Sequence, residues 1–237
     1  MSEDTAAAMD SVTTWEQTWR PTLHRWSSDQ MASADSGHGI DHVQRVVENA
    51  KRLGIAENAN PAIFLPAAWL HDCVAVAKNS PQRSLASRLA AKAAEDFLES
   101  IDYPPDLIPA ISHCIAAHSF SANIPCETIE AKVVQDSDRL EAVGAIGLAR
   151  CLMTGGSMRQ RLYHPDSPFP IDRPAMDNVQ SIDHFFSKLL GLHKTMQTAA
   201  GKVEARQRTD FLIAFLKQLG YEIGYPVDEL DRLIERC

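Results

Sequence analysis

The dipeptide His71-Asp72 places an imidazole and a carboxylate side by side, directly after the apolar residues 67–70. Such a pair gains meaning only from its context, which here is His42 upstream and Asp138 downstream. Two imidazoles and two carboxylates suit a divalent cation, with coordination positions left for water and a substrate oxygen. These ligand types are compatible with Mn²⁺, Mg²⁺, Fe²⁺, Co²⁺, Ni²⁺ and Zn²⁺, so the sequence predicts a metal site without naming the metal.

Three expected helices must position these four side chains. A helix over about residues 40–53 carries His42 and has three valines on its inward face. Residues 62–71 are almost wholly apolar, which is typical of a central helix. Asp138 belongs to a long or broken helix over residues 128–153. The four residues therefore come from segments that only the fold can bring together.

Helical geometry limits which other polar residues can join the same ion. Asp136 competes with Asp138, but two positions on a helix are about 200° apart, so both carboxylates cannot face one cation. Periodicity leaves this choice open, because both aspartates have apolar neighbours at helical spacing. His113 and His118 are five positions apart, which is about 140° on a straight helix, so these two would not naturally contact one ion.

The whole sequence predicts an all-α fold. Apolar residues recur at helical spacing, and strand signals are nearly absent. Residues 1–12 are expected to be a disordered tail, and residues 13–237 a single compact domain of roughly nine or ten helices. Residues 155–174, rich in Gly, Pro, Ser and Arg, predict a long irregular loop that is functional or mobile. The expected helices cover residues 13–31, 40–53, 62–71, 85–100, 106–118, 128–153, 179–192 and 195–219.

The composition argues against two classes of function. The 237 residues carry a formal net charge of −8, with a pI near 5.6. Proteins that coat nucleic acids or bind membrane surfaces need a basic surface, so neither class is expected. A phosphorylated substrate is compatible with this charge, because a bound cation and a few basic residues override the global sign locally. No apolar run approaches the roughly 18 residues of a membrane span.

The cysteines indicate a reducing compartment. They stand at positions 73, 114, 126, 151 and 237, an odd number without a C-x-x-C pair. This pattern predicts reduced thiols in a cytoplasmic protein, and the first residues lack the apolar segment of a signal peptide. Cys73 adjoins the metal pair but has no basic partner in the sequence, so we expect a buried, inert thiol and not a nucleophile.

Three segments together resemble the HD-domain metal-dependent phosphohydrolase superfamily, whose pattern is H…HD…D. They are GHGIDHVQRV around His42, LHD at residues 70–72 and QDSDRL at residues 135–140, and this resemblance covers about residues 35–150. The resemblance extends to nearly the whole chain, and to a bacterial branch of small stand-alone members, some described as nucleotide pyrophosphohydrolases. The wider runs that carry it are LHDCVAVAKNSPQRSLAS, HCIAAHSFSANIPCETIEAKVVQDSDRLEAVGAIGLARC and KTMQTAAGKVEA.

The resemblance implies a metal site made of His42, His71, Asp72 and Asp138. It selects Asp138 because the last aspartate of the superfamily pattern directly precedes an Arg-Leu or similar pair. Asp136 is then expected beside the site or on the surface. One tightly held divalent cation is favoured over two.

The resemblance also implies a reaction, the hydrolysis of a phosphate ester or anhydride, with a nucleotide as the expected small-molecule substrate. Metal-activated water would attack phosphorus, and nearby cations would stabilise the charge that grows on the phosphoryl oxygens. The two additional histidines are expected to contact phosphate or to act as general acids. The expected catalytic residues are Asp72, Lys78, His113 and His118. The expected substrate-binding residues are Lys78, Arg83 and Arg150.

Two other classes of function stay open on the sequence. One is a regulatory module that binds metal or nucleotide with little turnover. The other is a di-iron oxygenase, which would need more histidines in one cluster. A homodimer is also an open alternative.

Overall fold

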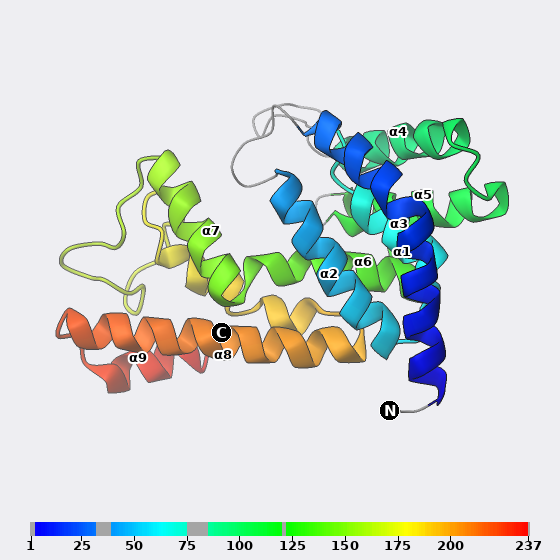
Figure 1. Cartoon of the computed structure of the whole chain (residues 1–237). Coiled ribbons are helices and arrows are strands. Elements are labelled where there is room, and N and C mark those ends of the chain that lie inside the picture. Colours follow the sequence, from blue (N-terminus) through cyan, green and yellow to red (C-terminus); the bar gives the residue numbers. More distant parts are fainter. Residues whose placement is uncertain (1–2, 32–38, 75–84, 120–121, 237) are drawn as a thin grey trace. The chain divides into compact units, whose positions relative to one another are not determined.

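Helices dominate the part of the chain that the structure describes (Figure 1). The computed structural model describes residues 3–31, 39–74, 85–119 and 122–236. Within these ranges, β-structure is limited to one isolated bridge between Arg161 and Gln180. The prediction of an all-α fold is therefore confirmed. None of the helices in these ranges has the length and apolar character needed to cross a bilayer.

The helical elements are of three kinds, 3₁₀, π and α. Short 3₁₀ segments cover Pro105–Leu107, Leu140–Ala142 and Leu192–Thr195, and a π-helical turn covers Phe185–Leu189. The α-helices are α1 (Glu3–Gln30), α2 (Ile40–Ala56), α3 (Pro61–Leu70), α4 (Ala86–Ser100), α5 (Ile108–His118), α6 (Ile129–Arg139), α7 (Gly144–Ser157), α8 (Ala199–Glu222) and α9 (Val227–Ile234).

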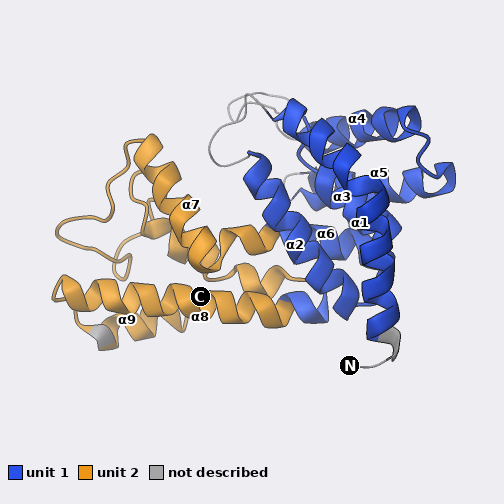
Figure 2. Ribbon diagram, viewed as in Figure 1, with its two compact units in different colours: residues 1–138, 197–201 blue, residues 139–196, 202–237 orange. Residues whose placement is uncertain are grey.

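The chain divides into two compact units (Figure 2). The first contains residues 1–138 and 197–201, and the second contains residues 139–196 and 202–237. All four expected metal ligands belong to the first unit. The expectation of a single domain over residues 13–237 stays a prediction.

The apolar helix α3 is central to the first unit, as its sequence predicts. It contacts α1, α2, α4 and α5, and residues 64–70 are buried. Its start is fixed by Asn60, whose side-chain oxygen accepts a hydrogen bond from the Ala62 amide (3.0 Å), and by Pro61 in the first turn. Because α3 is enclosed in this way, His71 leaves its end at a defined place in the core.

Helix α2 packs against α3 through the valine stripe that the sequence indicates. Val43, Val46 and Val47 are buried, and His42 is buried with them in the first turn of the helix. The inward face of α2 therefore carries both the packing residues and one imidazole of the expected site.

The long or broken helix expected over residues 128–153 is broken. Helix α6 ends at Arg139, and α7 begins at Gly144 after the 3₁₀ segment. Gly144 has a φ of 74°, which a residue with a side chain rarely adopts. As a result, Asp138 lies in the last turn of α6.

Residues 3–12 correct a prediction, because they form the first turns of α1 and not a disordered tail. Residues 6–8 are alanines, the strongest helix formers. Val12 and Trp15 are both buried, so packing holds this end of the helix as well.

The helix expected over residues 179–192 is also wrong in extent, because it shrinks to the π-helical turn. The amides of Ser181 and Ile182 donate to the carbonyl oxygens of Arg161 and Leu162, so they are not available for helical bonds. The irregular segment starts after Ser157, slightly later than expected.

Helix α9 is an addition that the sequence analysis did not predict. It has only 8 residues and is anchored by the buried Leu230 and Leu233.

Candidate metal centre

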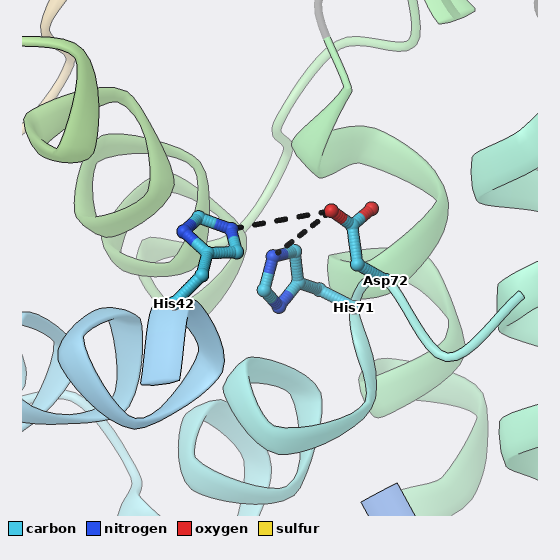
Figure 3. A group of neighbouring side chains, drawn as sticks. All are labelled: His42, His71 and Asp72. Atoms are coloured by element: carbon cyan, nitrogen blue, oxygen red, sulfur yellow. Dashed lines mark ion pairs between the residues drawn. The ribbon is translucent and has the colours of Figure 1, made fainter. Parts of the chain in front are cut away.

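The four expected ligands converge in the first unit, from α2, the end of α3, and α6. The Asp72 Oδ2 atom lies 4.0 Å from His42 Nε2 and 3.7 Å from His71 Nε2 (Figure 3). The Asp138 Oδ1 atom lies 3.4 Å from His42 Nε2 and 3.9 Å from His71 Nε2. The ligand atoms of His42, His71 and Asp72 all lie within 4.8 Å of one another, a spacing that could hold one metal ion. The fold thus gathers the H…HD…D residues around one point.

The hydrogen bond of His71 fixes its tautomer and leaves the Nε2 lone pair for this cluster. The Nδ1 atom lies 2.9 Å from the carbonyl oxygen of Ala68, which can only accept, so Nδ1 carries the proton. The Nε2 atom then has a lone pair, and it is buried without a hydrogen-bond partner among the residues that the structure describes. A buried acceptor without a partner is unfavourable unless a cation or water satisfies it.

The pKa of His71 also favours the binding of a cation at Nε2. Burial lowers the pKa of the ring below its usual value, which favours the neutral imidazole. A neutral imidazole is the form that binds a metal. An orphaned, neutral nitrogen beside two carboxylates therefore fits a divalent cation chemically.

The two carboxylates are held in their ionised form. Burial opposes ionisation of Asp72, but His71 and His118 outweigh it, so the pKa of this carboxyl lies well below its usual range. Burial also opposes ionisation of Asp138, but its hydrogen bond with His42 and the charge of nearby imidazoles lower its pKa.

The cluster has a closed side and an open side. The side chains of His42 and His71 are 2% and 0% exposed, whereas those of Asp72 and Asp138 are 33% and 30% exposed. A substrate could therefore approach past the carboxylates, while the imidazoles form the buried wall.

His118 joins the cluster and His113 does not. The Nε2 atom of His118 lies 3.6 Å from Asp72 Oδ1, and its Nδ1 atom lies 2.7 Å from the Ile115 carbonyl oxygen. The Nε2 atom of His113 instead accepts a hydrogen bond from the Glu127 amide (3.2 Å). The acid or phosphate role expected for His113 is therefore left without geometric support.

Asp136 is buried but faces away from the cluster. Its carboxylate accepts hydrogen bonds from the amides of Gln197 (3.0 Å) and Thr198 (2.8 Å) and from the Thr198 hydroxyl (2.7 Å). These amides directly precede α8. The structure thus gives Asp136 a partner of its own and places Asp138 beside the imidazoles.

Of the three expected substrate-binding residues, the structure describes one. Lys78 and Arg83 lie outside the described residues. Arg150 belongs to the second unit, where it donates a hydrogen bond to the Glu141 carbonyl oxygen (3.1 Å). Their roles stay predictions.

Cys73 has the character that the sequence indicates. It is buried, and its thiol contacts the Ala90 carbonyl oxygen (3.5 Å). Burial and the charge of Asp72 raise the pKa of this thiol to about 12. A thiol in this state is a poor nucleophile.

Comparison with known proteins places the chain in a family. The HD domain model matches residues 39–143, which include all four candidate ligands. An HD-superfamily hydrolase from Bacillus thuringiensis is 32% identical, with 89% of this chain and 100% of that chain covered and a TM-score of 0.69. This chain belongs to the HD-domain superfamily.

A second relative is the uncharacterized protein YpgQ of Bacillus subtilis. It is 31% identical over 206 residues, which cover 85% of this chain and 92% of YpgQ. The crystal structure of YpgQ in complex with ADP matches with a TM-score of 0.66 and 30% identity, and it covers 86% of this chain and 97% of that chain. The likeness therefore extends well beyond the HD motif.

Two buried polar residues of this HD domain escaped the sequence analysis. Asn49 lies on the inward face of α2, and Gln135 lies in α6 before the aspartates. Both are at least 95% buried. Both could have been predicted, because each is an amide side chain on an otherwise apolar helix face. A buried amide in such a position needs a specific hydrogen-bond partner.

Proposed function

We propose that this HD-domain protein is a metal-dependent phosphohydrolase that cleaves a phosphate ester or anhydride, with a nucleotide as substrate. The observation that carries the proposal is the convergence of two imidazoles and two ionised carboxylates, in which the His71 Nε2 atom has no hydrogen-bond partner within the described part of the chain. Membership of a superfamily that includes hydrolases supports it further.

His42, His71, Asp72 and Asp138 would hold the cation. A divalent ion bound there supplies Lewis-acid polarisation of a phosphoryl oxygen and activation of water. The two histidines bind as neutral rings, and the two aspartates contribute the negative charge that retains a dication.

His118 is the protein group best placed to handle a proton near the substrate. Burial lowers its pKa, but the hydrogen bond and charge of Asp72 outweigh burial and raise it above the usual value. The protonated ring that this favours can donate to a phosphoryl or leaving-group oxygen. Asp72 orients the ring through the Oδ1 atom while its Oδ2 atom faces the metal position.

A nucleotide substrate is supported by the relative YpgQ, which was crystallised with ADP. We propose that Lys78 and Arg83, in the segment that follows the metal pair, bind the phosphates, and that Arg150 assists them. Cations at these positions would stabilise the charge that develops on the transferred phosphoryl group. Turnover that survives Lys78→Ala unchanged would remove this lysine from the proposal.

The test is a hydrolysis screen on the metal-free full-length protein. Nucleoside mono-, di- and triphosphates are each supplied with Mn²⁺, Mg²⁺, Co²⁺ or Ni²⁺, and released phosphate and pyrophosphate are measured separately. We expect turnover of at least one nucleotide only when a metal is added. The identity of the product shows which bond breaks.

The wild-type protein and a variant without one metal ligand together test the enzyme against a regulatory module. His71→Asn is expected to abolish both metal binding and turnover. Wild-type protein that binds a metal and a nucleotide but releases no product would contradict the enzyme and favour the regulatory module. Wild-type protein that binds neither metal nor nucleotide would contradict both.

A further inference from the structure

Three buried polar side chains hold the last turns of α6 in place, and none of them is one of the four expected metal ligands. Asn49 donates from its Nδ2 atom to the Ser137 carbonyl oxygen (3.2 Å). Gln135 donates from its Nε2 atom to the Ala117 carbonyl oxygen (2.8 Å). Asp136 accepts from the amides of residues 197 and 198. These contacts tie the turn that carries Asp138 to three other segments of the first unit.

Two of these contacts end beside residues of the metal centre. Asn49 donates to the Ser137 carbonyl, which belongs to the peptide that links Ser137 to Asp138. The Ala117 carbonyl belongs to the peptide that links Ala117 to His118. Polar groups that fix ligand-bearing backbone commonly tune a metal site without touching the metal.

Gln135 connects the last turns of α5 and α6 through its side-chain amide. Its Nε2 atom donates to the last turn of α5, where helical carbonyls lack an amide partner four residues later. Its Oε1 atom accepts a hydrogen bond from the side chain of Gln197, so both ends of the amide are engaged. The amide therefore has one defined orientation, and the last turns of α5 and α6 have one defined separation.

We propose that Gln135 is a positioning residue for the metal centre, which fixes the turn bearing Asp138 against the turn bearing His118. This inference rests on the proposed function, because it assumes that the cluster binds a metal. Ligand groups must be held within about 0.5 Å of the productive geometry, and a mobile α6 turn would not meet that limit. Gln197 has the lesser role of holding the Gln135 amide.

The test compares metal binding by Gln135→Met with binding by the wild type. Methionine keeps the length and approximate volume of glutamine but removes both hydrogen bonds. The apo full-length proteins are titrated with Mn²⁺ by calorimetry, and the visible spectrum of bound Co²⁺ reports the coordination geometry. We expect a fall in Mn²⁺ affinity of about 10- to 100-fold and a changed Co²⁺ spectrum.

Tyr103→Phe is the matched control for a loss of stability alone. The Tyr103 hydroxyl donates to the Ala62 carbonyl oxygen (2.6 Å) at the start of α3, away from the cluster. This variant loses a part-buried hydrogen bond to a helical carbonyl and the buried one that the Tyr103 hydroxyl accepts from Trp15 Nε1, so its melting temperature should fall. Its Mn²⁺ affinity and Co²⁺ spectrum should equal those of the wild type.

Gln197→Met is a milder variant that decides the question if Gln135→Met does not fold. Gln197 is exposed, and its loss leaves the Gln135 bond to Ala117 in place, so we expect a smaller but measurable fall in affinity. Wild-type Mn²⁺ affinity in the folded glutamine variants would overturn the positioning role and leave the proposed function standing. An equal loss in Tyr103→Phe would also overturn it. Wild-type protein that binds neither ion would overturn the proposed function, and the positioning role with it.

Discussion

At the scale of single residues, Asp136 and Asp138 show how environment separates two identical side chains. Asp138 lies beside His42 and His71 with its carboxylate 30% exposed. Asp136 is fully buried and accepts hydrogen bonds from the amides that precede α8. One carboxylate is available to a cation and the other already has hydrogen-bond donors, so substitutions should have different consequences.

Asp138→Asn is expected to remove the metal, and Asp136→Asn to weaken the fold. Loss of a ligand should lower metal-dependent turnover at least about 100-fold, because losing an outer contact alone costs 10- to 100-fold. Asp136→Asn should lower the free energy of unfolding by about 1–3 kcal/mol, since the amides of Gln197 and Thr198 lose a charged acceptor. Metal content and urea unfolding are measured for both variants. Equal metal loss in the two variants would contradict the assignment of Asp138.

The raised pKa of Cys73 predicts that its thiol reacts slowly in the native protein. Its pKa of about 12 leaves about one thiolate in ten thousand at pH 8, because ionisation falls tenfold for each pH unit below the pKa. Iodoacetamide should therefore label native Cys73 far more slowly than Cys73 in urea, as peptide mass mapping would measure. Cys73→Ala should keep turnover within about tenfold of the wild type. Rapid native labelling, or loss of turnover in this variant, would point to a reactive thiol.

At the scale of elements, the crossing of α2 and α3 sets the distance between the two imidazoles. Gly54, in the last turns of α2, lies so close to α3 that an added Cβ atom would come within 2.4 Å of the Phe64 ring. Phe64 is itself fully buried, so its ring has little room to move. The absence of a side chain at Gly54 therefore permits the close packing of the helices that carry His42 and His71.

Gly54→Ala should force these helices apart. We expect a loss of about 1–3 kcal/mol in the free energy of unfolding from overpacking, and a weaker Mn²⁺ affinity. Gly156→Ala is the control, because no atom of the described residues lies within 4 Å of its added Cβ atom in α7. Alanine there should raise stability by up to about 1 kcal/mol through helix propensity. Calorimetric titration and thermal melting measure both effects, and an unchanged melting temperature in Gly54→Ala would contradict the close packing.

At the scale of the whole molecule, the cluster links metal binding to folding. Its ligands come from segments between residues 42 and 138, so an unfolded chain cannot present them together. A ligand that binds only the folded state raises stability by mass action. The buried, orphaned Nε2 atom of His71 should also gain a partner when the metal binds.

Mn²⁺ should therefore raise the melting temperature of the wild-type protein. At a free concentration about 100 times Kd, the expected gain is about 2.7 kcal/mol, or about 5–10 °C for a chain of this size. A chelator should reverse the shift, and Asp138→Asn should not show it. A shift of the same size in Asp138→Asn would place the ion elsewhere on the protein.

Much of the site can be predicted from the sequence, because ligand types and helical periodicity are local properties. The apolar run of residues 62–71 predicts a central helix, and the structure confirms that α3 is buried. The end of α6 is less predictable, since the break before Gly144 depends on a backbone conformation. Helix α9 and the π-helical turn at Phe185–Leu189 depend on packing that a local pattern does not specify.

By itself, the sequence determined an all-α chain with His42 on one helix and His71-Asp72 at the end of another, both with apolar faces that turn inward. Helical periodicity alone did not decide between chemically equivalent candidates; the family resemblance selected Asp138 over Asp136, and the tertiary structure decided where each side chain lies. It brought Asp138 and His118 to the cluster, and it gave Asp136 and His113 hydrogen-bond partners elsewhere. The physical reason is that a helix separates such residues by about 140–200°, and the packing of neighbouring helices fixes which direction faces the metal position.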